Sequence, residues 1–74
     1  MIVAKLQTRN FDFCAYGQTV SHAKNALIKG LVNHGKQYGL DDDWFSEYED
    51  SIFTMYIKMN CAYRDNTQIK DMSK

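Results

Sequence analysis

The stretch from Thr19 to Leu40 constrains the fold most. It carries a residue that can cap the start of a helix, an amphipathic pattern along the helix, and a glycine that can end it. At 100° per residue six of its positions fall within about 60° of one line, and these are Val20, Ala23, Leu27, Leu31, His34 and Tyr38. The Thr19 hydroxyl can accept from a backbone N–H one turn later, and Gly39 before Leu40 fits a glycine stop. The pattern predicts an amphipathic helix of about 19 residues.

Strand-like alternation lies on both sides of this helix. In residues 2–8, IVAKLQT, apolar positions recur with period two, and the alternation resumes at Phe11 after Arg9 and Asn10. This break favours a hairpin, with one long bent strand as the alternative. Residues 51–60, SIFTMYIKMN, form the clearest strand, and residues 61–64 either continue it or form a short fourth strand after a bend at Asn60.

These elements predict a small α+β fold. We expect a three- or four-stranded, mostly antiparallel sheet in the order β-β-α-β, with or without a further strand, and one helix on one face. The chain has 74 residues, too few for a second core, so residues 1–74 form a single domain with residues 65–74 as a frayed tail. The face away from the helix is expected to carry Val3, Lys5, Tyr16, Tyr56 and Lys58.

The segment DDDWFSEYED, residues 41–50, holds six of the nine acidic residues and three aromatic ones. One interpretation is structural: one of Asp41, Asp42 and Asp43 caps a short helical turn while the aromatic rings plug the core. The other interpretation is a surface that meets a basic partner or imitates an acidic ligand. The predicted partner-binding residues are Asp42, Asp43, Trp44, Glu47, Tyr48, Glu49 and Asp50.

The alternative function is a nucleotide or nucleic-acid binding protein that uses the start of the helix and the basic face of the helix. Free N–H groups and the positive end of the helix dipole favour a phosphate there, and the candidate residues are Gly17, Thr19, Lys24 and Lys29. One glycine is not a phosphate-binding loop, and a net charge of zero with a pI near 6.7 disfavours nucleic acid.

Metal and enzyme chemistry find little support in the sequence. His22 and His34 are 12 residues apart, which on a helix means about 18 Å of rise and about 120° of rotation, so they cannot share an ion within one chain. No CxxC pair is present. Cys14 and Cys61 are expected to be free thiols that act as small apolar core residues, and an enzyme that uses one of them as nucleophile is the third alternative. We therefore predict no cofactor, no metal and no catalysis.

Two further features bear on partners. Gly30 lies with Ala23 and Ala26 on one flank of the helix, and its helix penalty indicates a close approach, either to the sheet or to a second subunit. Open sheet faces and strand edges also favour a homodimer. No apolar run reaches the length of a signal peptide or membrane span, so a cytoplasmic protein without membrane contact is expected.

The run FDFCAYGQTVSHA leads from an aromatic-rich strand through Gly-x-Thr into a helix, and it resembles HicB-like antitoxin domains. The resemblance covers residues 11–31, with Gln18 where the family has an acidic residue and His22 where it has a glutamate. It implies a protein that binds and blocks another protein without catalysis. The prediction is therefore a small binding module that masks a protein partner, as antitoxins and inhibitors from phages or mobile elements do.

Overall fold

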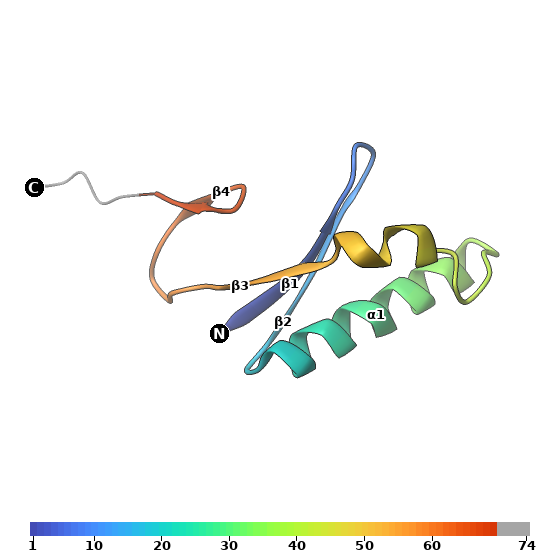
Figure 1. Ribbon diagram of the computed structural model, residues 1–74, viewed down its shortest axis with the longest axis horizontal. Coiled ribbons are helices and arrows are strands. Elements are labelled where there is room, and N and C mark those ends of the chain that lie inside the picture. Colours follow the sequence, from blue (N-terminus) through green and yellow to red (C-terminus); the bar gives the residue numbers. More distant parts are fainter. Residues whose placement is uncertain (70–74) are drawn as a thin grey trace, which may run out of the picture.

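The computed structural model describes residues 1–69 and confirms the small α+β fold (Figure 1). Three strands form an antiparallel sheet in the order β2-β1-β3, and one helix packs on one face of it. A second, two-stranded sheet pairs β4 with β5. The elements in chain order are β1 (Ile2–Gln7), β2 (Asp12–Gly17), α1 (Val20–Gln37), the 3-10 helix η1 (Ser46–Ser51), β3 (Phe53–Tyr56), β4 (Tyr63–Arg64) and β5 (Thr67–Gln68).

The first two strands form the predicted hairpin, and Thr8 holds its turn. The Thr8 amide donates to the Phe11 carbonyl at 2.8 Å, and the Thr8 hydroxyl accepts from the amides of Asn10 and Phe11. This side chain supplies the acceptor that a threonine offers in turns. It explains how Arg9-Asn10, without a glycine, closes the hairpin.

Both predicted ends of the helix are confirmed. The Thr19 hydroxyl accepts from the His22 amide at 3.1 Å, and Gly39 follows the helix with φ +73°, a value that suits glycine. The buried face carries Ala23, Leu27, Leu31 and Gly35. Val20 and Tyr38 are exposed, contrary to the prediction, because they lie at the two ends of the helix, where the sheet no longer covers them.

The core lies between the helix and one face of the sheet. Its buried members are Ala4, Leu6, Ala23, Leu27, Leu31 and Phe45. Half-buried apolar side chains surround them, including Ile2, Phe11, Phe13, Ala15 and Ile52. The alternation in β1 and β2 therefore places the predicted apolar positions toward the helix.

The outer face of the sheet differs from the prediction in β3. Val3 pairs with Met55 and Tyr16, so Met55 and not Tyr56 shares the outer face with Val3. Tyr56 pairs with Ile2 on the helix side and is 64% exposed. The reason is Ile52, which packs against the core directly after η1 and thereby fixes which positions of β3 face the helix. Val3 is fully buried although it lies on this outer face.

The part of the chain after β3 also departs from the prediction. The ladder ends at Tyr56, the chain turns at Asn60 with φ +62°, and residues 63–68 form a separate hairpin instead of extending the sheet. Its turn reaches the outer face, where Asn66 accepts from Lys5 Nζ and donates to Gln7 Oε1. Part of the expected frayed tail thus forms β5, and residues 70–74 lie outside the described residues.

Candidate functional site

The acidic segment, residues 41–50, connects the end of α1 to β3 through backbone turns. The Trp44 amide donates to the Asp41 carbonyl at 3.1 Å, and the Ser46 amide donates to the Asp43 carbonyl at 2.9 Å. The residue that precedes η1 is Phe45, and no side chain caps this helix. The expectation that an aspartate side chain caps the turn is therefore wrong, because backbone carbonyls form the turns.

Trp44 anchors the segment to the side of the helix. Its indole N–H donates to the Leu31 carbonyl at 2.8 Å, and its ring lies directly against Gly35. A Cβ on Gly35 would stand 2.5 Å from Cδ1 of Trp44, so only glycine leaves room for the ring. The sequence reasoning missed this role of Gly35, since at 100° per residue it lies outside the predicted apolar stripe.

The other two aromatic rings of the segment also point inward. Phe45 is buried with the core, and Tyr48 is half-buried, with its ring 5.8 Å from that of Phe11. The Trp44 ring lies 5.9 Å from Phe11 and 5.7 Å from His34. The rings therefore serve as the predicted core plug and fix the position of the backbone on both sides of them.

The acidic side chains of the segment all remain exposed. They are Asp41, Asp42, Asp43, Glu47, Glu49 and Asp50. Glu47 and Glu49 lie in the first turn of η1, where the helix dipole favours negative charge. Six carboxylates thus occupy a segment whose aromatic rings hold it against the core. We call these six side chains the acidic surface.

The residues of the alternative phosphate site do not converge. Thr19 uses its hydroxyl to cap the helix, and a Cβ on Gly17 would lie 2.6 Å from the Ala23 amide nitrogen, so Gly17 serves the close approach of the strand to the helix. Lys24 and Lys29 are both exposed, but five residues of helix separate them by about 140° of rotation. The two ammonium groups therefore leave the helix on different faces.

The cysteines are exposed, and the expectation that they belong to the core is wrong. Cys14 lies on the outer face of the edge strand β2, and Cys61 lies in the connection between β3 and β4, so neither position is covered by the helix. The Cys14 thiol lies 3.9 Å from the Tyr16 hydroxyl, and this hydrogen bond, with the charge of the thiolate, raises the pKa of Tyr16. His34, at 5.0 Å from the ring of Phe13, is half-buried as predicted.

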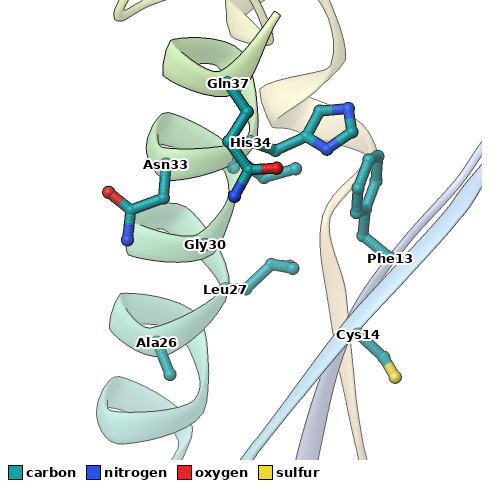
Figure 2. Close-up of a pocket in the computed structure, with 9 residues that line it drawn as sticks. Phe13, Cys14, Ala26, Leu27, Gly30, Asn33, His34 and Gln37 are labelled. Carbon is teal, nitrogen blue, oxygen red and sulfur yellow. The ribbon is translucent and has the colours of Figure 1, made fainter.

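An open groove of about 250 Å³ runs between α1 and the free edge of β2. Its walls include Phe13, Leu27, Gly30 and Asn33, and Figure 2 shows the side chain of Cys14 directed away from the helix. A Cβ built on Gly30 meets no atom within 4 Å. The expected close approach of Gly30 to the sheet beneath is therefore wrong, because Gly30 lies on the exposed flank of the helix.

Residues 1–69 contain no group of three or more histidine, cysteine, aspartate or glutamate side chains placed to hold a metal ion. No helix in this part of the chain has both the length and the apolar character to cross a bilayer.

Comparisons with protein-family models, with curated proteins and with solved structures find no match to this chain.

Proposed function

We propose that this protein is a small non-enzymatic binding module that masks a basic surface of a protein partner through the acidic surface of residues 41–50. The observation that carries the proposal is that the aromatic and the acidic side chains of the segment point in different directions. The rings of Trp44, Phe45 and Tyr48 pack inward, whereas all six carboxylates face solvent.

Anchoring matters because binding by a preorganised surface loses less conformational entropy than binding by a flexible tail. The Trp44 hydrogen bond and the backbone turns at Asp41 and Asp43 hold the backbone that carries the carboxylates in place before a partner arrives. Repulsion among six like charges also raises the free energy of the isolated protein, and a basic partner relieves it. Masking of a partner is also what the resemblance to antitoxin domains implies.

The nucleotide or nucleic-acid alternative has less support. Its two lysines diverge, and the hydroxyl of Thr19 is occupied as the helix cap. We therefore retain the acidic surface as the binding site.

Quantitative capture from a native lysate tests the proposal. The test variant combines Asp42→Asn with Glu47→Gln, and the control combines Gln18→Lys with Asn25→Lys; each adds two units of charge at exposed positions. We expect the test variant to lose a captured protein that the wild type and the control retain. That protein should also be released by salt, because exposed charge pairs are screened. If wild type and test variant capture the same proteins in equal amounts, the acidic surface is not the binding site.

A further inference from the structure

The outer edge of β2 presents unpaired backbone groups. In the order β2-β1-β3, the part of the chain that the structure describes places a strand on one side of β2 only. The Thr8 amide bonds to the Phe11 carbonyl, and hydrogen-bonded pairs alternate along an antiparallel ladder, so Phe13 and Ala15 direct their backbone groups toward β1. The N–H and C=O groups that face away from the sheet are consequently those of Asp12, Cys14 and Tyr16. Such an edge is a template for another strand.

The flank of α1 beside this edge carries two small residues and two uncharged polar ones. It contributes Ala26, Gly30, Asn33 and Gln37 to the groove (Figure 2). The three lysines of the helix lie at exposed positions outside this flank, at Lys24, Lys29 and Lys36. Glycine weakens a helix interior, and no contact among residues 1–69 explains Gly30, since a Cβ there meets nothing within 4 Å. A second helix at this flank would explain both the small side chains and the absence of charge.

We infer that two copies of the chain form a twofold dimer in which their β2 strands pair antiparallel about Cys14. In this register Cys14 pairs with Cys14 of the other copy, and Asp12 pairs with Tyr16. All three outward-facing residues of each strand are then used, which gives about six backbone hydrogen bonds. A register centred on Asp12 would bring two carboxylates together. A register centred on Phe13 would leave Tyr16 without a partner among the outward-facing residues, and one centred on Ala15 would leave Asp12 without one.

The same twofold axis explains why this flank of the helix has small residues and no charge. The groove brings Cys14 together with Ala26 and Gly30, so an axis at Cys14 passes beside these two small residues. A twofold axis perpendicular to the sheet sets the two helices antiparallel, with Ala26 and Gly30 of one facing the same flank of the other. Because a twofold interface places a surface against itself, a charged flank would repel its own copy. The neutral flank thus fits a second copy of this chain.

Light scattering after size exclusion, together with sedimentation at rising concentration, tests this dimer. We expect a wild-type dimer and compare Gly30→Glu with Asn25→Glu, which adds the same charge on the opposite side of α1. Neither new side chain meets an obstacle within one copy, because both positions are exposed. Gly30→Glu should weaken the dimer about 100-fold, through like charges at the interface, and Asn25→Glu should leave it unchanged. A monomeric wild type up to near-millimolar concentration would overturn the inference.

A short bismaleimide locates the axis, since the two cysteines are both exposed. Paired residues in such a ladder have Cα atoms about 5.5 Å apart, so Cys14 should cross-link to Cys14 of the other copy through two thioether bonds. We expect a covalent dimer from Cys61→Ser and much less from Cys14→Ser. A dimer that cross-links through Cys61 alone, or that is unaffected by Gly30→Glu, would place the interface elsewhere and contradict the β2 pairing.

Discussion

Substitution by alanine at two glycines of the same helix should change the free energy of unfolding in opposite directions. A Cβ at Gly35 would lie 2.5 Å from Cδ1 and 2.7 Å from Nε1 of Trp44, whereas a Cβ at Gly30 meets nothing within 4 Å. Alanine in place of glycine stabilises a helix interior by about 1 kcal/mol. Gly30→Ala should gain this amount in full, because nothing among residues 1–69 opposes the added methyl group.

Gly35→Ala should instead destabilise the protein. Forcing the Trp44 ring to move costs about 2 kcal/mol by analogy with overpacked cores. Losing the bond from the indole N–H to the Leu31 carbonyl, now 2.8 Å long, adds about 1 kcal/mol. After subtraction of the helix gain of about 1 kcal/mol, the net loss in the free energy of unfolding is about 2 kcal/mol. For a domain of this size it lowers the Tm by about 10 °C, while Gly30→Ala raises it by about 5 °C.

Urea denaturation followed by fluorescence and circular dichroism measures both changes. Trp44 is the only tryptophan, so its emission also reports whether the ring has left Gly35. The comparison is made below micromolar concentration, so that association through the Gly30 flank does not contribute. If both alanine variants are equally stabilised, the ring does not occupy the space above Gly35 and the anchoring of the acidic segment is refuted.

Three further changes test local features of the fold. Thr19→Ala should lower the free energy of unfolding by about 1 kcal/mol in urea denaturation, because the cap to the His22 amide is lost. Cys14 and Cys61 should both react with a thiol reagent in the native monomer, and a thiol that reacts only after unfolding would contradict its exposure. Cys14→Ala should lower the pKa of Tyr16 toward its ordinary value in a tyrosine NMR titration, because the hydrogen bond with Cys14 and the charge of its thiolate raise that pKa. An unchanged pKa would show that the two groups do not interact.

Local signals predicted much of this fold. Thr19 and Gly39 mark the ends of the helix because capping depends on residues within one turn. The hairpin between residues 7 and 12 followed from the break in alternation, although Thr8, not the turn dipeptide, holds it. These features rest on short-range hydrogen bonds and on the period of the apolar residues.

The sequence pattern could not predict which residues far apart in the chain pack against one another. In residues 52–57 both alternating faces of the strand carry apolar side chains. Only the contact of Ile52 with the core decides which face turns toward the helix. The role of Gly35 likewise depends on a ring that arrives from nine positions later in the chain. For the acidic segment, the pattern indicated both a core plug and a surface, and the structure divides these roles between the aromatic and the acidic side chains.

The two proposed surfaces lie on different sides of the helix, and this separation allows them to be tested independently. Gly35, against which Trp44 packs, is five residues from Gly30, or about 140° of rotation away. We therefore expect Asp42→Asn with Glu47→Gln to leave the oligomeric state unchanged, and Gly30→Glu to leave a single acidic surface intact. Because a dimer carries two such surfaces, Gly30→Glu should weaken capture by a partner with repeated basic sites more than capture by a partner with one. Equal weakening for both partners would show that the two surfaces are coupled within one copy.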